Sequence, residues 1–247
     1  MELKWPEFRG VLTLAPDAAQ VFAVPLGEVR MPGDELLTAL SAEERERAER
    51  LKLDKPRRQF VVGRAALRAV LGAHLRTPPQ DLAIDCDAHG KPRLAGASDS
   101  TGLRFNVAHS ADVVIVAVTA GCEVGVDVER VRPVSHSEQI ARRYFHTAEI
   151  DAILALPTSK RDHAFLQCWA GKEAVLKATG TGLTESLASF RVPVEHHAGT
   201  WINIPSATIA ERAGRCWLQP LVPSPGYVAA LACVGEKRKV ACFTLQM

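Results

Sequence analysis

The chain has 247 residues, of which 47% are hydrophobic, and a formal net charge of +2. This hydrophobic content excludes a globally disordered chain, and the nearly neutral charge gives no reason to expect a nucleic-acid partner. The longest apolar run, residues 113–120, is far too short to cross a bilayer, so no membrane association is expected.

The six cysteines form no C-x-x-C pair and match no zinc-binding spacing. Several lie within apolar runs, where a free cysteine behaves as a small hydrophobic residue. The first ten residues are rich in charge and lack the apolar core of a signal peptide. The sequence therefore predicts a cytoplasmic protein with reduced cysteines.

Hydrophobic periodicity and turn residues predict both helices and strands along the chain. In the first half, strands are expected at residues 21–25, 82–86, 105–107 and 113–119, and helices at 41–53 and 57–71. The second half is expected to begin with a strand at 124–129, to continue with helices at 137–145, 147–156 and 161–179, and to end in short strands that include 229–234 and 240–245. Ser41 and Glu44 have the spacing of a capping box at the start of the first helix.

The two halves of the chain resemble each other weakly. The segment 59–64 is echoed by 167–172, nearly half the chain later. Two unrelated amphipathic helices could produce the same echo by chance. We predict an α+β fold with two similar α/β subdomains related by a pseudo-twofold axis, at residues 1–121 and 122–247.

Two acidic segments have a spacing that would let them share one cation. Asp127 and Glu129 are two residues apart in an expected strand, so they project to the same face. Glu173 and Lys177 are four residues apart in an expected helix and are neighbours on its surface. Three carboxylates offer the oxygen ligands that Mg²⁺ prefers, and a lysine beside them suits a phosphate. The pattern predicts chemistry on a phosphorylated substrate.

Each acidic segment also has a simpler structural interpretation. The strand could be an edge strand with a solvated polar face. The helix could be an ordinary amphipathic helix whose Glu173–Lys177 pair contributes only about 0.2–0.5 kcal/mol. This simpler interpretation is stronger for Lys172, which could be exposed. The apolar residues around Glu173 and Lys177 favour the functional interpretation, because they place both side chains beside a buried stripe.

Polar residues at the end of another expected strand form a second group. Asn106, His109 and Ser110 follow Phe105 where this strand is expected to end. A lone histidine is more often a hydrogen-bonded structural residue than a ligand, but the strand end makes this one the better candidate among the histidines. The Gly-Lys-Pro segment at 90–92 could be a plain turn.

Taken together, these motifs resemble the 4′-phosphopantetheinyl transferases of the surfactin-synthetase-activating type. The similarity runs in the family's order from about Ser41 to Leu183. The matching motifs are Gly-Lys-Pro at 90–92, Phe-Asn-x-x-His-Ser at 105–110, Gly-Val-Asp-Val-Glu at 125–129, Tyr-Phe-x-x-x-Glu at 144–149 and Trp-x-x-Lys-Glu-x-x-x-Lys at 169–177. The chain length and the repeated halves also match the pseudodimeric form of that family.

The resemblance implies an enzyme, a holo-[acyl-carrier-protein] synthase or 4′-phosphopantetheinyl transferase. Such an enzyme moves the phosphopantetheine arm of coenzyme A onto a serine of an apo carrier protein and releases 3′,5′-ADP. The resemblance further implies Mg²⁺ as cofactor, an acyl, peptidyl, aryl or polyketide carrier as partner, and a monomeric protein. Phosphoryl transfer is catalysed mainly by positioning and electrostatics, which suits the charged residues of these motifs.

The same resemblance places the metal ligands on the second subdomain and the active site in a cleft between the two. It also assigns roles to individual residues. Asp127, Glu129 and Glu173 would hold the metal ion on the diphosphate. Glu173, or Glu129 through a water molecule, would deprotonate the carrier serine, and Lys177 would stabilise charge on the departing 3′,5′-ADP. The expected contacts to coenzyme A come from Arg47, Gly90, Lys91, Pro92, Asn106, His109, Ser110 and Lys177.

Two positions depart from the family's pattern. Ala108 stands where the family usually has a serine, which removes one hydroxyl contact. Glu44 stands where some members carry a basic residue for the 3′-phosphate of coenzyme A. This departure leaves Arg47 as the best hydrogen-bond donor to the 3′-phosphate on that helix.

The resemblance also places the carrier-docking surface. Carrier proteins are typically acidic around the modified serine, so a local basic and apolar face is expected. It should lie in residues 133–156, where Arg142, Arg143, Tyr144 and Phe145 cluster. Of these, Phe145 is expected to be a core residue.

Two functions from other classes stay open on the sequence alone. One is another Mg²⁺-dependent phosphotransferase or hydrolase that acts on a nucleotide diphosphate. The other is a non-catalytic module that binds coenzyme A or a carrier. Asp127, Glu129, Glu173 and Lys177 argue against such a module, because a degenerate site would have little reason to keep all four.

Overall fold

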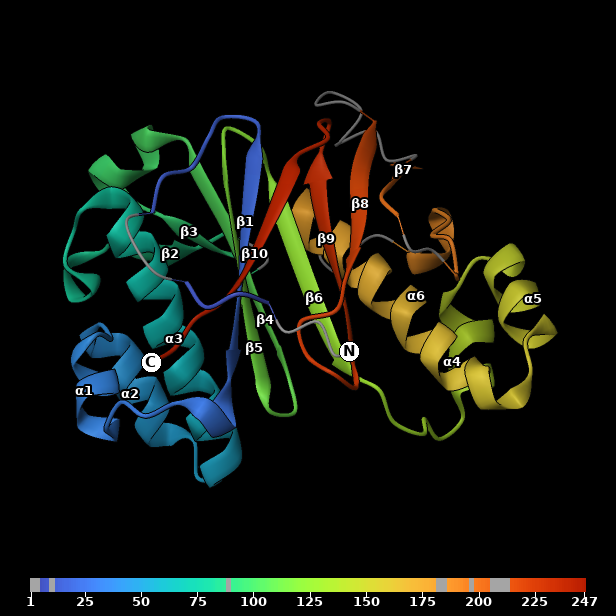
Figure 1. Ribbon diagram of the computed structural model, residues 1–247, viewed down its shortest axis with the longest axis horizontal. Helices are drawn as coiled ribbons and strands as arrows, with labels where there is room; N and C mark the ends of the chain where they lie inside the picture. The colour runs from blue at the N-terminus through green and yellow to red at the C-terminus, as the bar shows by residue number, and fades with distance from the viewer. Residues whose placement is uncertain (1–4, 9–11, 88–89, 181–185, 196–197, 205–213) are drawn as a thin grey trace. The chain divides into compact units, whose positions relative to one another are not determined.

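A computed structural model describes residues 5–8, 12–87, 90–180, 186–195, 198–204 and 214–247 of the protein (Figure 1). Its helices are α1 Gly33–Thr38, α2 Ala42–Arg50, α3 Asp54–Leu75, α4 Ser137–Tyr144, α5 Thr147–Ala155 and α6 Thr158–Thr179. Its strands are β1 Ala18–Pro25, β2 Ile84–Cys86, β3 Pro92–Leu94, β4 Leu103–Ser110, β5 Val113–Ala120, β6 Val124–Arg130, β7 Thr200–Asn203, β8 Arg215–Leu221, β9 Tyr227–Val234 and β10 Lys239–Thr244. Short 3₁₀ helices occupy Leu26–Glu28, Pro79–Asp81, Gly96–Thr101 and Leu187–Ser189.

The chain divides into two compact units. The first contains the described residues up to Gly121 together with Lys239–Met247, and the second is Cys122–Arg238. Each unit has its own main sheet and a 22-residue helix, α3 in the first and α6 in the second. The expected α+β class with two helix-and-sheet halves is confirmed.

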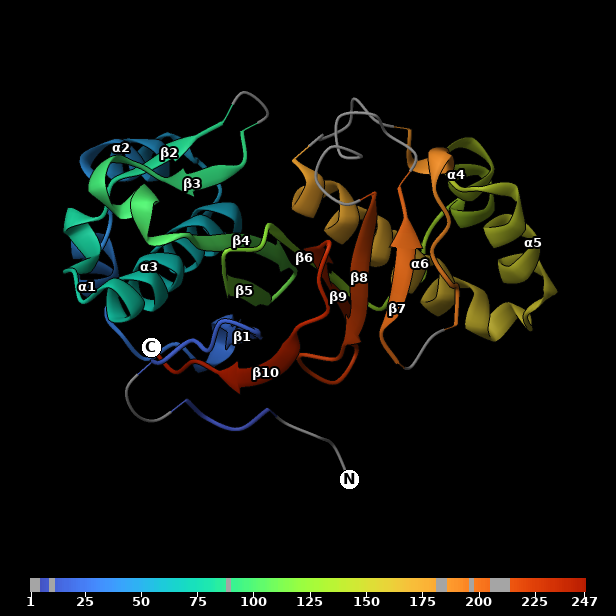
Figure 2. The same cartoon turned by 90° about the horizontal axis from the view of Figure 1, so that it is seen from above.

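Strand β10 belongs to the first unit although it comes late in the chain. It runs parallel to β1, with Ala18 opposite Lys239 and Ala23 opposite Thr244, and Figure 2 shows the two strands side by side. The observed second unit therefore ends earlier than the expected range of residues 122–247. The physical reason is strand pairing, because the backbone hydrogen bonds of β10 are made with β1.

In the first unit, the main sheet has the order β10-β1-β5-β4, β2 and β3 pair in a separate two-stranded sheet, and α3 packs against β4 and β5. The core of this unit includes the fully buried side chains of Phe22, Val24, Leu67, Leu71 and Val116. Burying a side chain of this size stabilises the fold by about 1.5–3 kcal/mol. The expected apolar stripe of the 57–71 helix is thus the face of α3 that covers the sheet.

Helix α2 begins with the capping box that the sequence predicts. The Glu44 amide donates to Ser41 Oγ over 3.3 Å, and the Ser41 amide donates to Glu44 Oε2 over 3.0 Å. The Glu44 carboxylate also pairs with Arg64 at 3.2 Å and with Arg68 at 2.6 Å. Both Glu44 and Arg68 are buried. Glu44 is therefore a structural anchor between α2 and α3, which accounts for an acidic residue at this position.

In the second unit, the described strands form an antiparallel sheet in the order β6-β9-β8-β7. Helix α6 lies along this sheet, mainly over β6 and β9 (Figures 1 and 2). Phe145 is buried beyond the end of α4 and stacks on Phe165 of α6 with ring centres 5.2 Å apart. The prediction that Phe145 is a core residue is confirmed.

The interpretation of Lys172 as an exposed residue is wrong. Its side chain is fully buried, and its Nζ lies 2.9 Å from the carboxylate of Glu149, which is also fully buried. The ammonium group further donates to the carbonyl oxygens of Leu187 and Phe190, at 2.7 and 2.8 Å. Burial is tolerated because every hydrogen of the charged group has an acceptor.

All six cysteines are free, and four of them, Cys122, Cys168, Cys216 and Cys233, are buried. The prediction of reduced cysteines that act as small core residues therefore holds for these four. Within the part of the chain that the structure describes, no helix combines the length and apolar character of a membrane span.

Candidate active site

The candidate site is built where α6 crosses β6. Gly125, Asp127 and Glu129 share the face of β6 that meets α6, as alternation along a strand requires. A Cβ added to Gly125 would overlap backbone atoms of Ala174 and Ala178. The backbone of the helix therefore rests directly on the backbone of the strand, which only a glycine permits. This close approach brings the last turns of α6 to the carboxylates of β6.

Lys177 and Asp127 make the central contact of the site. Lys177 Nζ lies 2.6 Å from Asp127 Oδ1, and the two side chains are 30% and 10% exposed. The second oxygen, Asp127 Oδ2, is buried and has no hydrogen-bond partner among the described residues. A buried carboxylate oxygen without a partner is unfavourable, so this oxygen is a natural position for an external cation or donor.

The carboxylates of the site act on one another electrostatically. Burial raises the pKa of Asp127 to about 6, the nearby Lys177 ammonium acts in the opposite direction, and the charges of Glu129 and Glu173 raise it further. Burial also raises the pKa of Glu173, which Lys177 lowers and Glu129 raises. The structure therefore brings Asp127, Glu129, Glu173 and Lys177 into one charged group, as the spacing predicts.

The donor chemistry of this group fits a hard divalent cation. Among the described side chains, no set of three His, Cys, Asp or Glu residues is arranged closely enough to enclose a metal ion by itself. Mg²⁺ does not require such a cage, because it commonly binds through one or two carboxylates and fills its shell with water and substrate phosphates. The unpartnered Oδ2 of Asp127 is an oxygen ligand of the type that this ion prefers.

The residues expected on the 105–107 strand lie on β4, which extends as far as Ser110. Because side chains alternate along a strand, Asn106 and Ser110 share one face of β4. His109 lies on the other face, the face that carries the core residue Phe105. Asn106 is buried and His109 is exposed. The structure thus groups Asn106 with Ser110 and separates His109 from both.

Gly90 and Lys91 lie in the turn between β2 and β3. Gly90 has a φ of +82°, the left-handed conformation that favours glycine. Asp87 closes the turn, since its Oδ1 accepts a hydrogen bond from the Lys91 amide at 2.9 Å. Pro92 is the first residue of β3. Gly90 and Lys91 therefore form a turn, as the simpler interpretation of the Gly-Lys-Pro segment has it, and Pro92 begins a short strand.

Arg47 is exposed on α2 and lies over an aromatic ring of α3. Its guanidinium carbon is 5.1 Å from the ring centre of Phe60, and that of Arg64 is 5.9 Å from the same centre. No functional role for Phe60 or Arg64 was expected from the sequence. The contact between Arg47 and Phe60 joins two helices rather than two turns of one helix, so no local sequence pattern indicates it.

The residues expected to dock a carrier protein divide into core and surface. Phe145 is buried, whereas Tyr144 is 39% exposed. Arg142 pairs with Glu138 on the same helix at 2.8 Å, and the guanidinium of Arg143 lies 5.2 Å from the Tyr144 ring centre. The basic residues of this segment are therefore at the surface.

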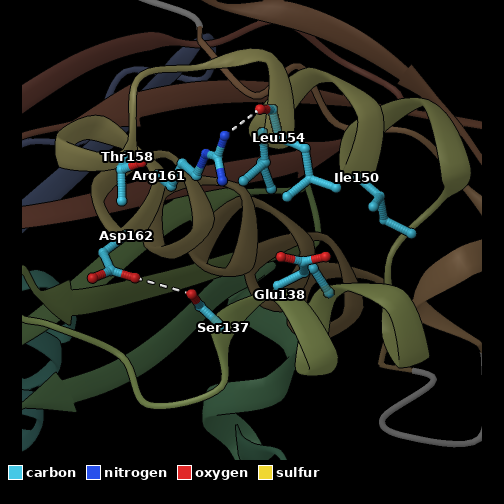
Figure 3. A pocket seen from close by; sticks show the side chains of 9 residues that line it. Ser137, Glu138, Ile150, Leu154, Thr158, Arg161 and Asp162 are labelled. Atoms are coloured by element: carbon cyan, nitrogen blue, oxygen red, sulfur yellow. Dashed lines mark hydrogen bonds between the residues drawn. The ribbon is translucent and has the colours of Figure 1, made fainter.

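A pocket of about 180 Å³ lies beside these residues, between α4, α5 and the start of α6 (Figure 3). Ser137 donates a hydrogen bond to Asp162 at 3.0 Å, and Arg161 donates to the carbonyl oxygen of Leu154 at 2.7 Å. The apolar part of the lining consists of Ala141, Ile150, Ile153 and Leu154. The pocket is therefore an apolar hollow with a hydrogen-bonded polar rim.

Comparisons with known proteins cover both units. The family model described as the 4'-phosphopantetheinyl transferase superfamily matches residues 123–232, and the one described as 4'-phosphopantetheinyl transferase, N-terminal, matches residues 34–121. The chain is 32% identical over 225 residues to the 4'-phosphopantetheinyl transferase HetI of Nostoc sp., covering 91% of each chain. It is 26% identical to psf-1 of Bacillus pumilus, over 86% of this chain and 88% of that one. It is also 26% identical to Sfp of Bacillus subtilis, over 80% and 84%. The chain belongs to the 4′-phosphopantetheinyl transferase family.

Proposed function

We propose that this protein transfers the 4′-phosphopantetheine arm of coenzyme A to a serine of an apo carrier protein and releases 3′,5′-ADP. The observation that supports this most directly is the 2.6 Å contact between Lys177 and Asp127, beside two further carboxylates. The group offers oxygen ligands for a divalent cation and an ammonium for a phosphate. In a member of this family, that combination suits the cleavage of a diphosphate.

We assign Asp127, Glu129 and Glu173 as the side chains that would hold Mg²⁺. When bound, Mg²⁺ supplies positive charge that neutralises the diphosphate of coenzyme A. The raised pKa values of Asp127 and Glu173 support this assignment, since burial disfavours the charged form of both carboxylates and a bound cation would favour it.

Glu173, or Glu129 through a water molecule, accepts the proton of the carrier serine in this proposal. Burial raises the pKa of Glu173, which makes it a stronger proton acceptor than an exposed glutamate. The serine oxygen forms a bond to the phosphorus that carries pantetheine, and the bond from that phosphorus to the oxygen of 3′,5′-ADP breaks. Lys177 stabilises the charge that this oxygen gains.

The first unit supplies the groups for the nucleotide end of coenzyme A. Arg47, Lys91 and His109 are the proposed phosphate contacts. Gly90 and Pro92 would shape the adjoining loop, and Asn106 and Ser110 would line the same region. The carboxylates belong to the second unit, so the proposal draws on residues of both units.

The partner in this proposal is an acidic carrier protein, either an acyl, peptidyl, aryl or polyketide carrier. The exposed Arg142 and Arg143 support docking in residues 133–156, because rim charges steer the association of oppositely charged partners. We further propose that the protein acts as a monomer in the cytoplasm, where coenzyme A and carrier proteins meet.

Mass spectrometry tests the proposed function directly. Apo carrier proteins are incubated with coenzyme A, Mg²⁺ and the purified protein, and each carrier should gain the mass of one phosphopantetheine group. EDTA should stop the reaction and added Mg²⁺ should restore it. No mass shift across a broad panel of carriers, with folded protein, would contradict the proposal.

The same reaction separates the other two functions. A phosphotransferase or hydrolase of another kind would consume coenzyme A without a carrier. A binding module would leave coenzyme A intact under all conditions. The proposed transferase consumes coenzyme A only when an apo carrier is present.

A further inference from the structure

Arg47 is not held by the acidic residues of its own helix. Glu43 lies one turn earlier on α2, the spacing at which a Glu–Arg pair normally forms. The Glu43 carboxylate instead accepts a hydrogen bond from Ser41 Oγ at 3.3 Å. Within the described residues, Arg47 forms no ion pair, so its charge is not neutralised locally.

Phe60 gives the Arg47 side chain a defined position. The guanidinium carbon lies 5.1 Å from the ring centre, within the range of a cation–π contact. The ring itself is fixed, because Phe60 is half-buried and packs against the core of the first unit. A long arginine side chain on a fixed ring loses less entropy when it binds a ligand than one that is free in solvent.

Arg64 completes the arrangement around the same ring. Its guanidinium carbon lies 5.9 Å from the centre of Phe60, and its charge is paired with Glu44 at 3.2 Å. Of the two arginines that approach Phe60, only Arg64 has a carboxylate partner among the residues described. Arg47 is therefore the one whose charge stays available to an anion.

We propose that Phe60 is a positioning residue that holds the Arg47 guanidinium for the 3′-phosphate of coenzyme A. The inference rests on the proposed function, because it takes coenzyme A as the substrate. Phe60 acts through Arg47 and contacts neither the phosphate nor the reacting atoms. Its effect should therefore appear in the affinity for coenzyme A and not in the turnover number.

The test measures binding of coenzyme A and dephospho-coenzyme A by calorimetry, with the purified full-length chain. Phe60→Leu should weaken coenzyme A by about 2- to 5-fold, the range of an exposed cation–π contact. Dephospho-coenzyme A lacks the 3′-phosphate and should bind the variant as tightly as the wild type. Phe60→Tyr keeps the ring and should restore the affinity for coenzyme A.

A double variant connects the effect to Arg47. In the Arg47→Ala background, Phe60→Leu should cause no further loss of coenzyme A affinity. A matched control is Trp201→Leu, which removes a similar contact, 4.0 Å from the Arg215 guanidinium carbon to the ring centre, on the second unit. Trp201→Leu should leave the affinities for coenzyme A and dephospho-coenzyme A unchanged. Melting temperatures of all variants confirm that they are folded.

The outcomes separate the inference from the proposed function. If Phe60→Leu weakens both ligands equally, or still weakens coenzyme A without Arg47, Phe60 does not position Arg47. The same conclusion follows if the variant binds coenzyme A as the wild type does. If the wild type binds no coenzyme A at all, the substrate assignment itself is wrong, and the inference fails with it.

Discussion

Lys172 and Glu149 form an ion pair of 2.9 Å with both side chains fully withdrawn from solvent. Glu149 also accepts hydrogen bonds from the backbone amides of His146 and Val192, at 2.9 and 2.6 Å. The pair thus ties α5 and α6 to the chain near Val192. Both charged groups have hydrogen-bond partners. Removing one member of the pair would leave the other charged and buried without its counter-ion, which costs much folding free energy.

Lys172→Met should therefore lower the free energy of unfolding by about 3–5 kcal/mol, because it leaves Glu149 charged and buried without a cation. Urea titration followed by circular dichroism measures the change. Lys55→Met is the control, since Lys55 pairs with Asp112 at 3.1 Å on the surface and its loss should cost less than about 1 kcal/mol. Similar losses in the two variants would contradict the prediction.

Gly125→Ala should lower the melting temperature and abolish transfer. The added Cβ would overlap the backbone of α6, so the helix must move away from β6 and carry Lys177 away from Asp127. Gly63→Ala is the matched control on α3, where a Cβ would lie 3.7 Å from Val114, an ordinary contact. This control should keep activity and gain stability from the better helix propensity of alanine. Normal transfer by Gly125→Ala would show that the close approach is not required.

Asp127→Ala and Glu173→Ala should each abolish transfer while the fold is kept. Little packing is lost, and Lys177 is exposed enough to turn to water when Asp127 is removed. Carrier mass spectrometry and circular dichroism measure the two properties. Asp151→Ala, at an exposed position of α5, is the control and should transfer normally. Wild-type turnover by either site variant at physiological Mg²⁺ would remove that residue from the site.

Arg47→Ala should weaken coenzyme A by about ten-fold or more, because charge-assisted hydrogen bonds contribute about 1.5–3 kcal/mol. Dephospho-coenzyme A should be affected much less. Arg50→Ala, an exposed arginine of the same helix, should affect neither ligand. His109→Ala should also weaken coenzyme A if His109 grips a nucleotide phosphate. Equal losses for both ligands in Arg47→Ala would show that Arg47 does not contact the 3′-phosphate.

Reversing Arg142 and Arg143 to glutamate should raise the Michaelis constant for the carrier and leave coenzyme A affinity unchanged. Rim charges act mainly on the rate of association and its salt dependence, so the effect should be largest at low salt. The double variant Lys52→Glu/Arg57→Glu makes the same charge change on exposed residues of the first unit. Unaltered carrier kinetics at low salt would place the docking surface elsewhere.

Much of the fold could be predicted because its longer elements carry periodic signals. Helices α3 and α6 are each 22 residues long, α3 carries an apolar stripe, and Ser41 with Glu44 marks the start of α2. The short elements α1, β3 and β7 were not located, because three to six residues contain too little of a period to recognise. Strand β8 was missed as well, and it contains Pro220, a residue that weakens a strand signal.

The candidate site likewise contains features that the sequence predicts and features that it does not. Spacing within β6 puts Asp127 and Glu129 on one face, and spacing within α6 makes Glu173 and Lys177 neighbours, so these two pairs could be predicted. The contact between Asp127 and Lys177 joins the two elements and is seen only in the fold. The burial of Lys172 depends on Glu149, which lies on another helix, and the interpretation of Lys172 as an exposed residue was therefore wrong. The contact between Arg47 and Phe60 likewise joins two helices. Interactions between elements leave no local pattern, so the sequence alone does not indicate them.

The pairing of β10 with β1 also sets an order for folding during synthesis. Residues 122–238 form one unit that is continuous in sequence, so all of its residues are synthesised in a single stretch. The other unit is begun first but lacks an outer strand until residues 239–244 emerge. Until then β1 presents an unpaired backbone edge, which can recruit strands from other nascent chains. The portion of the polypeptide made earliest is thus the last to become complete.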